Sequence, residues 1–135
     1  MKYVNKELKI SFEVDDDYEE LDKDEFDADG GTLFIFKNSS GNVFSINIDY
    51  GNGESYEDII GWNIDNLRNV GIVIKNQETF VHEGRRIDVV YSTFESLSFV
   101  TYFTFVYGNV ITCSIEADEE AEKDLRNLYI SIKEL

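Results

Sequence analysis

Apolar and polar residues alternate along most of the chain, a pattern typical of strands that bury one face. The first such stretch is residues 8–14, in which every second side chain is apolar. Residues 32–37 and 43–50 are two more β-rich runs, and the Asn, Ser and Gly residues between them favour a hairpin. The pattern therefore predicts three strands in the first fifty residues.

Two segments have the period of an amphipathic helix instead. In residues 55–70 the apolar side chains recur every three to four positions, Ser55 and Asp58 have the spacing of a capping box, and Gly71 follows as a stop signal. The second helix is predicted to begin at Asp118 and to carry an apolar stripe as far as Leu135.

Four closely spaced strands are predicted between the two helices, over residues 72–82, 85–94, 97–107 and 109–115. Short turns such as Gly108-Asn109 are typical of an antiparallel meander. The strand at 97–107 is apolar on both faces, which indicates that both of its faces are covered.

These elements predict an α+β fold in which an antiparallel sheet is flanked by two amphipathic helices as an α/β/α sandwich. A chain of 135 residues without a visible linker is predicted to form a single domain over residues 1–135. Residues 15–29 form an acidic insertion after the first predicted strand, and the spacing of Tyr18, Leu21 and Phe26 in it favours a short helical turn or a tethered loop.

The order of elements resembles the PsbP/DcrB-like fold superfamily, which includes small bacterial proteins of largely unknown role. Residues 3–12 look like its first strand, the helix at 55–70 has the same place, and residues 102–111 with 128–133 look like its final hairpin and helix. Asp15 and Tyr18 stand where that family often has Pro and Trp. The resemblance implies a sheet between helices and a protein that binds other proteins or acts as an accessory or chaperone. It implies no catalytic residues.

Charge narrows the range of partners. The chain has 28 acidic and 12 basic residues, a formal net charge of −16. This excess of acidic residues argues against binding to nucleic acid or to anionic membranes, because proteins bind both mainly through Lys and Arg side chains. The N-terminal residues contain no signal-peptide pattern and no window is apolar enough to span a membrane, so we expect a cytoplasmic protein.

The acidic charge is concentrated in the insertion. Nine of the sixteen net negative charges lie in residues 15–29, where Lys23 is the single basic residue. The acids are Asp15, Asp16, Asp17, Glu19, Glu20, Asp22, Asp24, Glu25, Asp27 and Asp29. We predict that they form a solvated surface that binds a protein with a basic surface, because such a patch accelerates association with a basic partner.

Two other features of the chain are candidate binding sites. Residues 25–30 resemble the first half of a calcium loop, but the position for its bidentate acid is Phe36, so a metal site is not expected. Trp62 falls outside the apolar stripe of its helix, and it is either an exposed contact for a partner or is covered by a neighbouring loop.

No catalytic motif is present. Cys113 lies on an apolar strand face and is expected to be a buried, inert thiol, and His82 is expected at the surface beside a strand end. The pair Arg85-Arg86 is expected to counter nearby acids, although one of the two could anchor a carboxylate ligand. The sequence indicates neither a cofactor nor a nucleotide site.

The leading hypothesis is therefore a non-enzymatic protein-binding or accessory domain with an acidic docking surface. A second hypothesis is an immunity or inhibitor protein that neutralises a basic toxin or nuclease. A third, less favoured, is an enzyme that uses two carboxylates for acid–base chemistry, since such pairs leave no sequence signature.

Overall fold

Ten strands and two helices make up the part of the chain, residues 1–23 and 31–135, that the computed structural model describes. In chain order they are β1 (Lys2–Asn5), β2 (Ile10–Glu13), β3 (Glu19–Leu21), β4 (Thr32–Lys37), β5 (Val43–Asp49), α1 (Tyr56–Asn69), β6 (Val73–His82), β7 (Arg85–Phe94), β8 (Leu97–Val106), β9 (Asn109–Glu116), α2 (Glu119–Ser131) and β10 (Lys133–Glu134).

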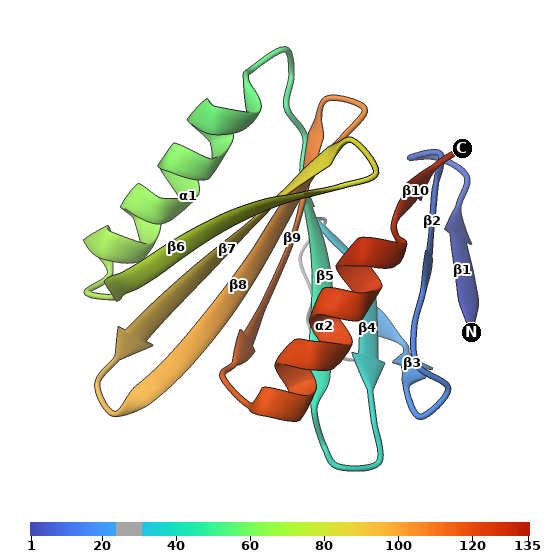
Figure 1. Cartoon of the computed structure of the whole chain (residues 1–135), viewed down its shortest axis with the longest axis horizontal. Coiled ribbons are helices and arrows are strands. Elements are labelled where there is room, and N and C mark those ends of the chain that lie inside the picture. The colour runs from blue at the N-terminus through green and yellow to red at the C-terminus, as the bar shows by residue number, and fades with distance from the viewer. Residues whose placement is uncertain (24–30) are drawn as a thin grey trace.

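Seven of these strands form one antiparallel sheet with the order β3-β4-β5-β9-β8-β7-β6 (Figure 1). A second, three-stranded antiparallel sheet has the order β1-β2-β10 and joins the two ends of the described chain. The predicted α+β class, with a large antiparallel sheet and two helices, is confirmed.

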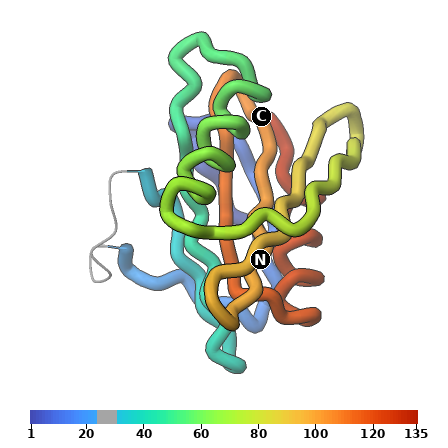
Figure 2. Tube along the Cα trace, turned by 90° about the vertical axis from the view of Figure 1, so that its left-hand side faces the viewer, coloured from blue at the N-terminus to red at the C-terminus, as the bar shows by residue number. Residues whose placement is uncertain are grey.

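The two helices pack on different sets of sheet residues. Side chains of α1 form a cluster with Val90 and Phe103, whereas side chains of α2 form a cluster with Val89 and Tyr102. Since neighbouring residues of a strand point to opposite faces, the two helices cover the sheet from opposite sides. Figure 2 shows α1 and α2 on different sides of the strands between them.

The start of the chain differs from the prediction. The single strand expected over residues 8–14 is the second arm of a hairpin, in which Tyr3 of β1 lies opposite Phe12 of β2. The turn includes Lys9, whose φ of 58° interrupts the extended backbone. The acidic insertion therefore follows the second strand and not the first.

Part of the acidic insertion is itself a strand. Residues Glu19–Leu21 form β3, which pairs with β4 so that Glu20 lies opposite Phe36. At these three residues the structure has a strand where a short helical turn or a tethered loop was predicted, because the outer edge of β4 offers backbone groups with which an extended segment can pair. The third residue of the predicted pattern, Phe26, lies outside the described residues.

The last helix is shorter than predicted. It ends at Ser131, Ile132 has an extended conformation, and Lys133–Glu134 then pairs with β2 as β10. Ile132 still enters the core, but Leu135, which was predicted on the helical stripe, is exposed. The helix stops because the following residues exchange helical hydrogen bonds for bonds with the second sheet.

Candidate functional site

The described part of the acidic segment is anchored by an aromatic residue. Tyr18 is 4% exposed, stacks on Phe44 with ring centroids 4.7 Å apart, and donates a hydrogen bond from its hydroxyl to Oδ2 of Asp124 in α2 at 2.9 Å. Burial raises the pKa of the Tyr18 hydroxyl, and the contact with the Asp124 carboxylate raises it further. The acids on either side of Tyr18 are thus held on a fixed surface.

The acids that precede Tyr18, Asp15 to Asp17, and the exposed side of α2 line two adjoining concavities of about 400 and 420 Å³, which share Asp15, Asp124 and Asn127. We call the two together the acidic groove. Its acidic lining residues are Glu13, Asp15, Asp16, Asp17, Glu120 and Asp124. Lys123 is the one lysine or arginine among its described lining residues, and the N-terminal ammonium group of Met1 lies 3.0 Å from Oδ1 of Asp16.

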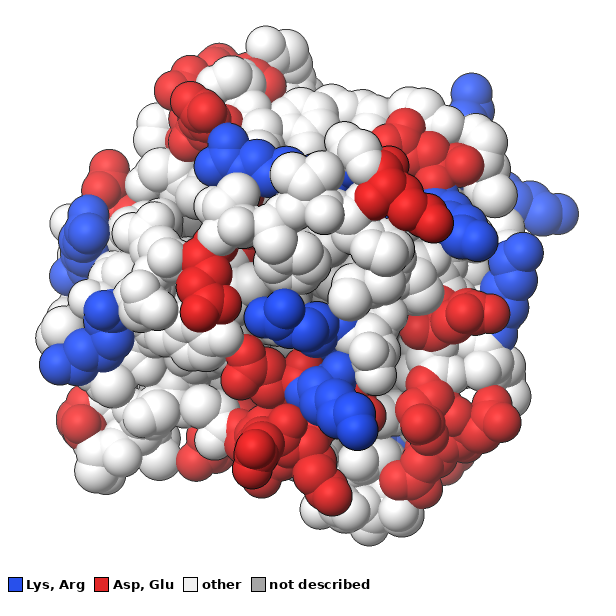
Figure 3. Space-filling view, viewed as in Figure 1, with Lys and Arg blue, Asp and Glu red and all other residues white. Residues whose placement is uncertain are grey.

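The charge distribution on this face agrees with the groove. Figure 3 shows acidic side chains gathered over the N-terminal end of α2 and over the loop between β2 and β3, with basic side chains interspersed. The acids of the loop are exposed to solvent, and the Asp16 side chain is 93% exposed. They are therefore available to an incoming partner without prior rearrangement.

The sequence predicts only half of the acidic residues that line this groove. Asp15, Asp16 and Asp17 were predicted as partner-binding residues, but Glu120 and Asp124 were read only as part of a helix. Glu19, Glu20 and Asp22 do not line either concavity. Asp24, Glu25, Asp27 and Asp29, with the calcium-loop pattern that includes three of them, lie outside the described residues.

Trp62 does not lie in the acidic groove. Its side chain is 52% exposed on α1, and it lines a separate concavity of about 440 Å³ with Tyr50, Asp49 and Asn63. This concavity shares no lining residue with the acidic groove. The exposure of Trp62 agrees with the first of its two interpretations, and its contact with a partner stays a prediction.

The adjacent arginines point to opposite faces of β7. Arg85 is directed towards α2, where Nη2 donates to the carbonyl oxygens of Tyr129 and Ile132 at 2.8 Å each and Nη1 donates to Oγ1 of Thr104 at 2.8 Å. A cation at the carbonyl end of a helix complements its dipole. Burial lowers the pKa of the Arg85 guanidinium.

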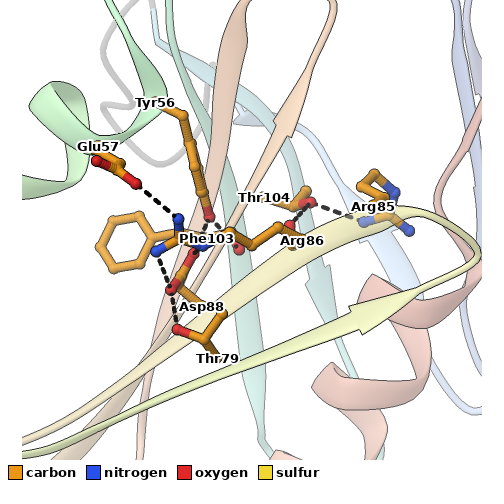
Figure 4. A network of polar contacts seen from close by, with 8 residues as sticks. All are labelled: Tyr56, Glu57, Thr79, Arg85, Arg86, Asp88, Phe103 and Thr104. Atoms are coloured by element: carbon orange, nitrogen blue, oxygen red, sulfur yellow. Dashed lines mark hydrogen bonds and ion pairs between the residues drawn. The ribbon is translucent and has the colours of Figure 1, made fainter.

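Arg86 is directed towards α1, where it holds a buried carboxylate (Figure 4). Its Nε donates to Oδ2 of Asp88 at 2.9 Å and its Nη2 donates to Oδ1 at 3.2 Å, a bidentate pair. The hydroxyl groups of Tyr56 and Thr79 also donate to Asp88, at 2.7 and 2.5 Å. Because these bonds already occupy the carboxylate, we interpret the cluster as a structural link between α1 and the sheet.

The single cysteine and the single histidine do not form a dyad. Cys113 is fully buried in β9, and burial raises the pKa of its thiol to about 12. His82 ends β6, where it is half-buried, and β7 and β8 lie between β6 and β9. Three strand spacings place β6 and β9 roughly 14 Å apart, too far for a hydrogen bond between the two side chains.

No cluster of three or more His, Cys, Asp or Glu side chains positioned to hold a metal ion occurs in residues 1–23 and 31–135. In the same part of the chain, neither helix has the length and apolar character needed to cross a membrane.

Comparison with known proteins identifies the fold. The chain is similar in structure to cyanobacterial PsbP from Synechocystis sp. PCC 6803, with a TM-score of 0.72 and 13% sequence identity over 100% of this chain and 92% of that one. It is also similar to PA94, a protein of unknown function from Pseudomonas aeruginosa, with a TM-score of 0.56 and 13% identity over 96% of this chain and 93% of that one. No family model and no curated protein sequence matches.

The chain therefore has a PsbP-like fold, as the resemblance in the sequence implied. At 13% identity this likeness concerns the fold, and the function must be argued from the surface of this chain.

Proposed function

We propose that the protein is a non-enzymatic accessory domain of α/β/α sandwich architecture that binds a protein with a basic surface. The acidic groove carries the proposal, since it combines carboxylates from the end of β2, the following loop and the exposed side of α2. Glu19, Glu20 and Asp22 of the same predicted segment are also exposed and add to its negative charge. The partner would supply Lys and Arg side chains to it.

The physical properties of the groove support docking more than catalysis. Two concavities of about 400 Å³ each are open to solvent and polar, and the side chains of Asp15, Asp16 and Asp17 are exposed. An enzyme that uses paired carboxylates needs two converging carboxyl groups whose different surroundings give them separate roles, whereas the acids of this loop share exposed surroundings. The chain has a net charge of −16, so it attracts a basic protein over a distance that the salt concentration sets.

Affinity capture with matched variants tests the proposal. The triple variant Asp15→Asn, Asp16→Asn, Asp17→Asn removes three charges from the groove with little change in side-chain volume. A control variant removes three charges elsewhere, at the exposed residues Glu7, Glu83 and Glu95, each replaced by Gln. We expect a stoichiometric partner to be captured at low salt by the unaltered chain and by the control, and to be lost from the groove variant.

The same experiment can refute the proposal. Retention of the partner by the groove variant, or equal loss from both variants, would show that the groove is not the docking surface. If the captured partner is a toxin or nuclease, protection of cells on co-expression would assign the chain to the inhibitor class instead of the accessory class.

A further inference from the structure

The concavity that Trp62 lines lies between α1 and the loop that follows β5. Its volume is about 440 Å³, and two aromatic side chains line it, Tyr50 at 53% and Trp62 at 52% exposure. Large aromatic side chains left half in solvent are enriched at the centres of binding surfaces. No Lys or Arg is among the described residues that line it.

The wall that carries Tyr50 is held in place by a close backbone contact. A Cβ atom on Gly51 would lie 1.9 Å from the carbonyl oxygen of Gly108, so the loop can approach the β8–β9 turn this closely only because residue 51 is glycine. The amide of Gly51 also donates to Oδ1 of Asn109 at 3.2 Å. The concavity is therefore formed before any ligand arrives, which lowers the entropic cost of binding.

Two carboxylates and one side-chain amide oxygen that line this concavity are hydrogen-bond acceptors. The side-chain amide nitrogen of Asn63 donates to Oδ2 of Asp49 at 3.0 Å and to the carbonyl oxygen of Ile59 at 2.9 Å, which uses both of its hydrogens. The side-chain oxygen of Asn63 and the carboxylates of Asp49 and Glu54 can then only accept. These groups favour a ligand that has hydrogen-bond donors and carries positive charge, since both charged side chains of the lining are carboxylates.

We infer that this concavity receives an arginine side chain of the basic partner, an inference that rests on the proposed function and names a second contact for it. A guanidinium group has five donors and no acceptor, can donate to the carboxylates of Asp49 and Glu54, and stacks on an aromatic ring such as Trp62. A lysine ammonium group is compact and strongly hydrated, and it uses an aromatic and carboxylate pair less well.

Tryptophan fluorescence reports directly on this concavity, since Trp62 is the single tryptophan of the chain. The full chain is titrated at low salt with the capped tripeptide acetyl-Gly-Arg-Gly-amide. The same peptide with citrulline, which is nearly isosteric but uncharged, and the same peptide with lysine serve as comparisons. We expect a saturable change in Trp62 fluorescence with the arginine peptide at concentrations on the order of millimolar. The citrulline peptide should produce none, and the lysine peptide should bind several-fold more weakly.

Two variants with the same change in charge locate the binding. Asp49→Asn should weaken binding of the arginine peptide about tenfold, because it removes a charge-assisted pair. Asp65→Asn, on the same helix as Trp62 but outside the concavity, should leave binding nearly unchanged. Equal binding of the citrulline or lysine peptide, or equal effects of the two variants, would overturn the inference.

Backbone amide shifts in the same titration separate this inference from the proposed function. Shifts confined to residues 49–54 and 59–66 support the arginine site. If these amides do not respond while those of residues 15–17 still shift with a polylysine probe, the arginine site is refuted and the acidic groove is not.

Discussion

At the scale of single residues, the pair Arg85-Arg86 shows how strand geometry separates neighbouring side chains. The sequence predicts two cations that counter nearby acids, and Arg86 does so through its bidentate pair with Asp88. Arg85 instead donates to the carbonyl oxygens at the end of α2. These lie more than forty residues away along the chain, so sequence spacing could not predict this contact. Adjacent residues on β7 thus support helices on opposite faces of the sheet.

Replacement of Arg85 by Met should destabilise the fold. The variant keeps an unbranched apolar stem but removes the guanidinium donor from the Ile132 carbonyl oxygen and the Thr104 hydroxyl, and it leaves the Tyr129 carbonyl oxygen with the Ile132 amide alone. We expect a loss of about 2–4 kcal/mol in the free energy of unfolding, measured by urea denaturation. Arg68→Met on the exposed side of α1 is the control and should change stability little, and an equally small effect of Arg85→Met would contradict the assignment.

Cys113 should be inert in the folded protein. Its thiol is fully buried and has a pKa of about 12, so at pH 8 almost no thiolate is present and no reagent can reach it. We expect a disulfide reagent to modify Cys113 rapidly in 8 M urea and, without urea, only at the rate of global unfolding. Fast modification of the native protein would show that β9 opens locally.

At the scale of elements, strong periodicity was sufficient to predict much of the fold. The four-strand meander and the bounds of β4 and β7 agree with the alternation of apolar residues, and the side chain of Ser55 caps α1 as predicted, by accepting from the amide of Asp58 at 3.2 Å. The short strands could not be predicted. β3 has one apolar residue and β10 has two residues in all, and both exist only because another strand offers them a pairing edge.

The candidate site was only partly predictable for a related reason. A concentration of charge can be read from a sequence, and this identified Asp15, Asp16 and Asp17. The acids of α2 that face them are more than a hundred residues away, and the contact between Tyr18 and Asp124 that joins the two segments is a product of the tertiary fold. The concavity at Trp62 depends in the same way on the contact of Gly51 with the β8–β9 turn.

Two glycines of neighbouring elements should respond to alanine in opposite ways. At Gly61, in the middle of α1, a Cβ atom meets nothing within 4 Å, so Gly61→Ala should stabilise the protein by about 0.5–1 kcal/mol through helix propensity. At Gly51 the added Cβ would overlap the carbonyl oxygen of Gly108, so Gly51→Ala should destabilise it. Thermal or urea unfolding of the two variants measures both effects, and a neutral Gly51→Ala would contradict the tight contact.

At the scale of the whole molecule, stability should fall in alkaline solution. Burial raises the pKa values of the Tyr18 and Tyr91 hydroxyls above 10.0 and that of the Cys113 thiol from 9.0 to about 12. Above pH 9 the unfolded chain therefore loses protons that the folded chain retains, and the free energy of unfolding must decrease as pH rises. Urea midpoints between pH 8 and pH 11 measure this effect, and a constant midpoint over that range would contradict the burial of these groups.

Docking at the acidic groove is tested most directly by the salt dependence of partner binding. The dissociation constant of the captured partner is measured between about 50 and 500 mM salt for the unaltered chain, for the triple variant at Asp15, Asp16 and Asp17, and for the control at Glu7, Glu83 and Glu95. We predict that affinity falls steeply with salt for the unaltered chain and the control, and that the groove variant binds weakly with a much shallower dependence. Equal salt dependence in all three proteins would contradict a docking site at this groove.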